Sequence, residues 1–207
     1  MNAMLEVRGL SSRRGDARLF TNLAFDVAAG TALSVRGPNG SGKTTLLRCV
    51  AGLARADAGE IRWRGHRVDP RDASWRADLA WSGHLAAIKD DLSAEENLAF
   101  ALRLRAATVP RAQLHAALDG AGLGARKRLA ARRLSAGQRR RIGLARLSLD
   151  PATLWVLDEP LTALDDDGQA FLASLLSRHL DKGGVALVAT HQPLALDAAR
   201  SPELRLA

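Results

Sequence analysis

The chain has 207 residues, 47% hydrophobic and 25% charged, a balance typical of a globular protein long enough to bury a core. Its formal net charge of +8 would suit nucleic acid or an anionic membrane surface, but we predict no nucleic-acid partner, because the chain has no Tyr and no basic platform interleaved with aromatic residues. No apolar run is long enough to span a bilayer, the N-terminus predicts no signal peptide, and the single Cys49 suits a reducing compartment.

The first part of the chain has the pattern of short strands. Apolar runs bounded by Gly, Asp or Asn predict strands at residues 5–7, 23–27, 32–35 and 61–63. A helical pattern follows Gly42 and ends near Gly52.

Beyond Trp81 the pattern becomes helical. Ser93 and Glu96 have the spacing of a capping box and predict a helix that runs to about Ala107. Pro110 begins a second helical pattern, and a third covers residues 136–149.

Strand patterns return in the last part of the chain. Two runs, at residues 153–157 and 185–190, are apolar throughout, as expected of parallel strands that are buried on both faces. An amphipathic helix lies between them. The order predicts an α/β protein that carries an all-helical insertion of about 60 residues.

One glycine-rich segment has the pattern of a phosphate-binding loop, with a predicted strand before it and a predicted helix after it. Glycines let backbone amides surround a polyanion, and the N-terminus of the following helix adds positive charge. A lysine ammonium can reach the β- and γ-phosphates of ATP, and a following threonine hydroxyl can ligate Mg²⁺. The residues predicted to bind ATP are Gly37, Pro38, Asn39, Gly40, Ser41, Gly42, Lys43, Thr44 and Thr45.

Two acidic residues end the apolar run at residues 153–157. We expect Asp158 to hold Mg²⁺, directly or through water, and Glu159 to polarise the attacking water as general base. An acidic pair after a strand is weak evidence by itself, because many such pairs are solvated turns. A phosphate-binding loop in the same chain makes the catalytic interpretation the stronger one.

A serine-led segment precedes the third helical pattern. Ser135 is a natural N-cap, so the segment Ser135, Ala136, Gly137 and Gln138 presents a hydroxyl, exposed amides and a positive helix end. These groups suit an anion site, but they equally suit a capped surface helix with a charged face. The residues alone leave both interpretations open.

The order of these motifs resembles that of the ATPases of ABC transporters. Leu134 to Gln138 looks like the family's LSGGQ signature, residues 162–165 are similar to its D-loop, which ends at Asp165, and His191 lies where the switch histidine lies. The resemblance covers essentially the whole chain and implies a P-loop NTPase of ABC-ATPase type. It would be a single domain whose α/β core is formed by residues 1–84 and 150–207, with a mostly parallel sheet and an N-terminal antiparallel β region. Residues 85–149 would form an inserted α-helical subdomain.

Several stretches resemble the ATP-binding subunit of the bacterial cytochrome c biogenesis haem exporter. They are the alanine of the signature, the run at residues 152–160, residues 190–194, and His84 at the position of the usual Q-loop glutamine. The chain departs from that group after His84, where Leu85-Ala86-Ala87 replaces Gln-Pro-Gly. The aromatic residue that stacks on adenine in most ABC ATPases is also missing, and either Arg14 takes its place or that arginine is a solvated turn residue.

The resemblance implies an ATP hydrolase that uses ATP and Mg²⁺, with Glu159, His191 and Lys43 as catalytic residues. It implies a homodimer that sandwiches nucleotide, each signature acting in trans, bound to integral membrane subunits at the cytoplasmic face of the bacterial inner membrane. Haem would be handled by the partner complex. Two alternatives are an ABC exporter for another cargo and an ABC-type ATPase without a membrane partner. A third, a module that only senses ATP, is disfavoured because Glu159 and His191 are present.

Overall fold

The computed structural model describes residues 3–83, 87–105 and 108–206. The chain divides into two compact units. The first comprises Met1–Trp81, Ala152–Glu159 and Leu176–Ala207, and the second comprises Ser82–Pro151 and Pro160–Leu175. His84, predicted at the Q-loop position, lies outside the described residues.

An antiparallel sheet forms the N-terminal part of the first unit. Its strands are β1 (Ala3–Arg14), β2 (Ala17–Ala28), β4 (Ala58–Trp63) and β5 (His66–Arg67), in the order β2-β1-β4-β5. Strands β1 and β2 are much longer than predicted. Next to the turn that joins them, the two strands pair polar and exposed residues, for example Arg13 with Arg18. This part of each strand therefore lacks the apolar alternation that marks a strand in sequence.

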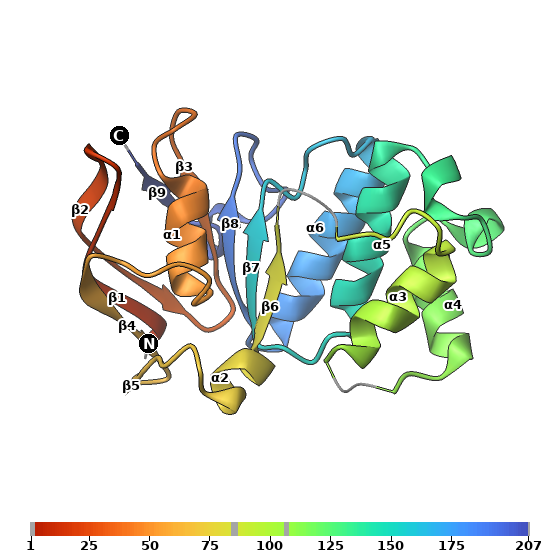
Figure 1. The fold of residues 1–207 in the computed structure, drawn as a ribbon, viewed down its shortest axis with the longest axis horizontal. Helices are drawn as coiled ribbons and strands as arrows, with labels where there is room; N and C mark the ends of the chain where they lie inside the picture. The colour runs from red at the N-terminus through yellow and green to blue at the C-terminus, as the bar shows by residue number, and fades with distance from the viewer. Residues whose placement is uncertain (1–2, 84–86, 106–107, 207) are drawn as a thin grey trace. The chain divides into compact units, whose positions relative to one another are not determined.

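The second sheet of this unit has five strands (Figure 1). The order is β6-β7-β8-β3-β9, and the pairs β7–β8, β8–β3 and β3–β9 are parallel. Every residue of β7 and β8 is buried, which agrees with their continuous apolar runs. The prediction of an α/β fold with an N-terminal antiparallel β region is therefore confirmed. The strands are β3 (Ala32–Arg36), β6 (Leu79–Ser82), β7 (Leu154–Asp158), β8 (Val185–Ala189) and β9 (Glu203–Arg205).

Both sheets share one hydrophobic core with helix α1 (Lys43–Val50). Leu46 and Leu47 of α1 are fully buried in it, together with Leu5 of β1 and Leu154 of β7. Because α1 is anchored by this apolar face, its N-terminus has a fixed position beyond the end of β3.

Some short elements of the chain were not predicted. Helix α2 (Ala73–Asp78) has Asp72 as its N-cap and buries Trp75, whose ring lies edge-on to Trp63 with centroids 6.0 Å apart. Strand β9 and the 3₁₀ turn η3 (Ala198–Arg200) were also missed. These segments have few residues and mixed polarity, so no periodic pattern marks them.

Helices make up the second unit. They are α3 (Ala94–Arg103), α4 (Arg111–Gly120) and α5 (Ala136–Leu149), with 3₁₀ turns η1 (Gly124–Arg126) and η2 (Ala131–Arg133) before α5. Leu98, Leu118 and Ile142, one from each helix, lie in its hydrophobic core. Helix α6 (Asp166–Asp181) begins in this unit and ends in the first. The inserted helical subdomain is thus confirmed, although α3 ends at Arg103, earlier than predicted.

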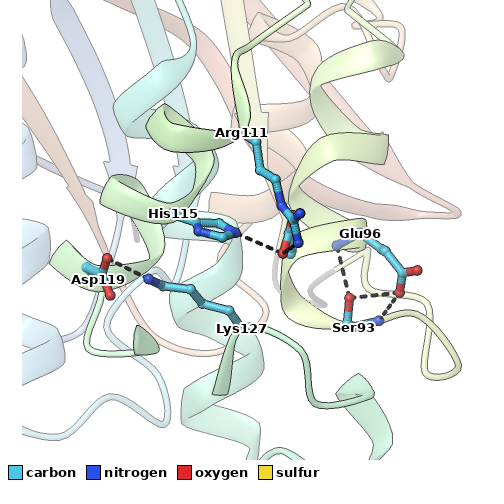
Figure 2. Close-up of polar contacts among 7 residues, drawn as sticks. Ser93, Glu96, Arg111, His115, Asp119 and Lys127 are labelled. Carbon is cyan, nitrogen blue, oxygen red and sulfur yellow. Dashed lines mark hydrogen bonds and ion pairs between the residues drawn. The ribbon is translucent and has the colours of Figure 1, made fainter. Parts of the chain in front are cut away.

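A charged cluster links α3 to α4 (Figure 2). Arg111 Nε lies 2.6 Å from one carboxylate oxygen of Glu95, and His115 Nε2 lies 2.9 Å from the other. Hydrogen bonds from Arg111 and then His115 lower the pKa of Glu95 to about 2. At the start of α3, Ser93 and Glu96 form the predicted capping box (Figure 2). Among the residues that the structure describes, no helix has the length and apolar character needed to cross a bilayer.

Candidate functional site

The loop between β3 and α1 has the backbone that a phosphate cradle needs. Gly37, Gly40 and Gly42 have φ of 155°, 87° and 93°. A Cβ at Gly37 would lie 2.5 Å from the carbonyl oxygen of Leu206, so a side chain there would displace the backbone. A Cβ at Gly40 would meet nothing within 4 Å, which leaves this side of the loop open to a ligand.

Lys43 is the first residue of α1, and its ammonium turns back over the loop. Nζ donates to the carbonyl oxygens of Gly37 at 2.8 Å and Pro38 at 3.0 Å. The side chain is largely buried, with the residue only 7% exposed. A compact cation therefore lies beside the loop amides, as binding of a polyphosphate requires.

Thr44 and Asp158 are 114 residues apart in sequence and in contact in the structure. The Thr44 hydroxyl lies 3.1 Å and 3.0 Å from the two carboxylate oxygens of Asp158. Asp158 is the last residue of β7 and is 2% exposed. A hydroxyl and a carboxylate are oxygen ligands of the kind that Mg²⁺ prefers, so this pair fits the metal expected from the sequence.

Glu159 and His191 follow neighbouring parallel strands, β7 and β8. Glu159 has φ of 50°, an uncommon value for a residue other than glycine, and its amide donates to the carbonyl of Ala189 at 2.9 Å. This turn brings Glu159 Oε1 to 3.3 Å from His191 Nε2. Their side chains are 19% and 49% exposed, so the carboxylate can be reached by water.

The serine-led segment caps α5 in the second unit. Ser135 Oγ accepts a hydrogen bond from the amide of Gln138, and Gln138 Oε1 accepts one from the amide of Ser135. Ser135 and Ala136 are exposed. A Cβ at Gly137 would collide with the carbonyl oxygen of Ala163, so glycine allows the loop at residues 162–165 to approach the tip of α5 closely.

Asp165, at the end of that loop, accepts hydrogen bonds from the Arg141 guanidinium and from the amide of Gly168. The Arg141 contact is the main cause that lowers the pKa of Asp165. Arg141 also donates to the carbonyl of Ala121. A cavity of about 450 Å³ lies here, and its lining includes Arg126, Ser135, Gly137, Gln138, Arg141 and Asp165.

Sequence reasoning missed the two arginines of this cavity. Residues 139–141 are three consecutive arginines, and their pattern indicates only a charged helix face. In the structure Arg141 is buried and paired, whereas Arg126 comes from a separate 3₁₀ turn. Arg14, considered for adenine stacking, is exposed at the end of β1.

The first unit thus combines a glycine loop at a helix N-terminus, a buried lysine, a hydroxyl–carboxylate pair and an accessible carboxylate. These features define a nucleoside triphosphatase with a phosphate-binding loop.

The family model described as "ABC transporter" matches residues 20–162. The chain is 46% identical over 198 residues to the cytochrome c biogenesis ATP-binding export protein CcmA 2 of Cupriavidus metallidurans, a match that covers 96% of this chain and 94% of that one. It is 44% identical over 203 residues to CcmA of Dechloromonas aromatica, across 98% and 100% of the two chains.

A solved structure of a putative ABC transporter ATP-binding protein from Pyrococcus furiosus has a similar fold. Its TM-score is 0.82 at 25% identity, covering 98% of this chain and 96% of that one. The chain therefore belongs to the ABC transporter family, and within it to the cytochrome c biogenesis ATP-binding export proteins. It is an ABC-type ATPase.

Proposed function

We propose that this chain binds and hydrolyses ATP to energise a membrane complex that handles haem for cytochrome c biogenesis, at the cytoplasmic face of the bacterial inner membrane. The similarity to CcmA proteins over nearly the whole chain supports the cargo and the location. One structural observation supports the ATPase role. The phosphate-binding loop, the Thr44–Asp158 pair and the Glu159–His191 pair all lie at the carboxyl ends of β3, β7 and β8, at the same edge of one sheet.

In the nucleotide-binding step, the backbone amides of the loop from Asn39 to Gly42, together with the Lys43 ammonium, would surround the β- and γ-phosphates of ATP. Thr45 would extend this phosphate-binding surface into α1. Thr44 and Asp158 would hold Mg²⁺, Asp158 directly or through water, and the metal would neutralise phosphate charge. The close contact between these two oxygen-bearing side chains supports this assignment.

In the chemical step, the Glu159 carboxylate would accept a proton from the water that attacks the γ-phosphorus. His191 Nε2 lies 3.3 Å from Glu159 Oε1, so its single N–H would donate either to that carboxylate or, with ATP bound, to an oxygen of the γ-phosphate. The left-handed backbone at Glu159 supports the assignment, because strain of this kind is concentrated at functional sites.

The cycle would need two copies of the chain. The tip of α5, from Ser135 to Gln138, would cap the γ-phosphate of ATP bound by the partner copy, with the loop that ends at Asp165 beside it. Loss of the γ-phosphate on hydrolysis would remove the charge that favours capping, so the dimer would open. The second unit would transmit this motion to the membrane subunits.

Affinity purification from the native membrane tests the cargo. We expect the tagged chain to co-purify with integral membrane proteins and with haem, identified by mass spectrometry and by its absorption spectrum. The matched control is the Lys43→Ala chain, in which ATP binding should be lost. Recovery of a membrane complex without haem, together with normal cytochrome c maturation in a strain lacking the chain, would contradict the haem-export role.

A further inference from the structure

The cavity at the tip of α5 contains charged side chains that the proposed cycle does not yet use. Arg126 and Arg141 contribute guanidinium groups to its lining, and Asp165 and Asp167 contribute carboxylates. The two positive and two negative charges balance. A triphosphate capped here by Ser135 would therefore meet a cavity without net positive side-chain charge. Binding of the triphosphate then depends on whether either guanidinium group is free to contact it.

The two guanidinium groups differ in what they contact. Arg141 is buried, forms an ion pair with Asp165 and donates to the carbonyl oxygen of Ala121. These contacts hold the loop at residues 162–165 and the end of α4 against α5, so the Arg141 guanidinium is already paired. The Arg126 side chain is exposed and forms no ion pair within the described part of the chain. It is the cation of this cavity that can turn toward an added anion.

The backbone fixes Arg126 at the cavity rim. It is the last residue of η1, where its amide donates to the carbonyl oxygen of Leu123 at 2.8 Å, and Leu123 is fully buried in the core of the second unit. The carbonyl oxygen of Arg126 accepts from the amide of Leu129 at 3.0 Å. The position of the Cα is thus held by the core, while the long side chain can move.

The neighbouring basic residues do not share this placement. Lys127 lies 2.6 Å from Asp119, with which it forms an ion pair. Arg128 is exposed but does not line the cavity. Both arginines carry the same charge and are two residues apart, so Arg128 separates the effect of position from that of net charge.

We propose that Arg126 binds the triphosphate of an ATP molecule held by the partner copy, as a trans contact beside Ser135. This inference rests on the proposed nucleotide-sandwiching dimer. Serine and the helix amides offer dipoles only, whereas a guanidinium donates several charge-assisted hydrogen bonds to phosphate oxygens. Without Arg126 the lining would carry a net negative charge, which would oppose the approach of the nucleotide.

The test uses the Glu159→Gln chain, in which slow hydrolysis should trap the ATP-bound dimer. Dimerisation is titrated by analytical ultracentrifugation with ATP and Mg²⁺, and ATP binding to the monomer is measured separately at low protein concentration. We expect Arg126→Ala and Arg126→Gln to weaken the dimer about tenfold, as loss of a charge-assisted hydrogen bond would. Monomer affinity for ATP should stay unchanged, and Arg128→Ala should have little effect on either quantity.

Each contrary result has a distinct meaning. Equal weakening by Arg126→Ala and Arg128→Ala would show a general charge effect and overturn the role of Arg126, as would a dimer that is unaffected by both Arg126 variants. A Glu159→Gln parent that binds ATP and never dimerises would overturn the proposed dimer and this role with it. Circular dichroism of each variant should show that the exposed substitutions leave the fold intact.

Discussion

Glu159 shows how a single residue depends on both its own backbone and a distant neighbour. Its φ of 50° turns the chain sharply after β7, and its amide is held by Ala189 at the end of β8. The same parallel pairing brings His191 within reach of the carboxylate. The proposed role of Glu159 in polarising water requires a side chain that is fixed but accessible, and this turn provides both conditions.

We predict that Glu159→Gln binds ATP normally but hydrolyses it at least 100-fold more slowly, because glutamine cannot accept the proton of the attacking water. Steady-state phosphate release measures turnover, and equilibrium binding of labelled ATP measures affinity. Glu60→Gln, a change at a carboxylate of β4, serves as the control and should retain activity. If Glu159→Gln turned over at the normal rate, Glu159 would not be the general base.

Two helices in the second unit begin with the same capping chemistry. Ser93 with Glu96 caps α3, and Ser135 with Gln138 caps α5. The capping box alone therefore does not mark a functional site. What distinguishes Ser135 is the cavity beside it and the close approach of the loop at Ala163, which only a glycine at position 137 permits.

The α3–α4 contact gives a prediction about pH. Because the pKa of Glu95 is lowered to about 2 in the folded state, its ion pairs stabilise the fold fully above the unfolded value of about 4.3, and this contribution is lost as the pH falls from there toward 2. We expect Glu95→Gln to reduce the free energy of unfolding by about 1 kcal/mol at pH 7, and by less below about pH 4.

Urea denaturation at pH 7 and at a pH below about 4 measures the free energy of unfolding of the Glu95→Gln chain and of the unmodified chain. Asp16→Asn, at the exposed turn between β1 and β2, removes a carboxylate that forms no ion pair within the described part of the chain, and it should change stability little at either pH. A destabilisation by Glu95→Gln that is equally large at acid pH would show that packing, and not the charge of Glu95, is responsible.

At the scale of the whole molecule, the first unit contains the phosphate-binding loop and the proposed catalytic carboxylate, and the second contains the serine-led helix tip. Each unit has its own hydrophobic core. A division of this kind suits a cycle in which the groups around one ATP come from different copies of the chain, which the proposed dimer requires.

We predict that Asn39 of one molecule comes close to Ser135 of another when ATP is bound. Both residues are exposed, so Asn39→Cys and Ser135→Cys chains can be mixed and joined by a short thiol cross-linker. Cys49 is buried, and burial raises the pKa of its thiol, so it should react slowly. Cross-linked dimers on a denaturing gel should form with ATP and not with ADP.

The control pairs Ser135→Cys with Asp16→Cys, an exposed position at the turn between β1 and β2, which should yield little product. Equal cross-linking of both pairs would indicate random collision. An absence of ATP-dependent product, with hydrolysis intact in the mixed sample, would exclude the head-to-tail arrangement.

Local patterns were enough to predict several parts of this protein from its sequence. The phosphate-binding loop, the capping box at Ser93, the N-cap at Ser135 and the buried strands β7 and β8 depend on residues that are neighbours in the chain. Spacing and periodicity record these features directly, and the order of the motifs indicated the family.

Other features were decided by tertiary structure alone. The contacts of Thr44 with Asp158, Glu159 with His191 and Arg141 with Asp165 join residues that are far apart in sequence. The long β1–β2 hairpin and the short strand β9 depend on partner strands rather than on their own polarity. Sequence determined which chemical groups this chain possesses, and the parallel sheet and helix packing determined which of them meet, because such contacts form only when distant segments are brought together.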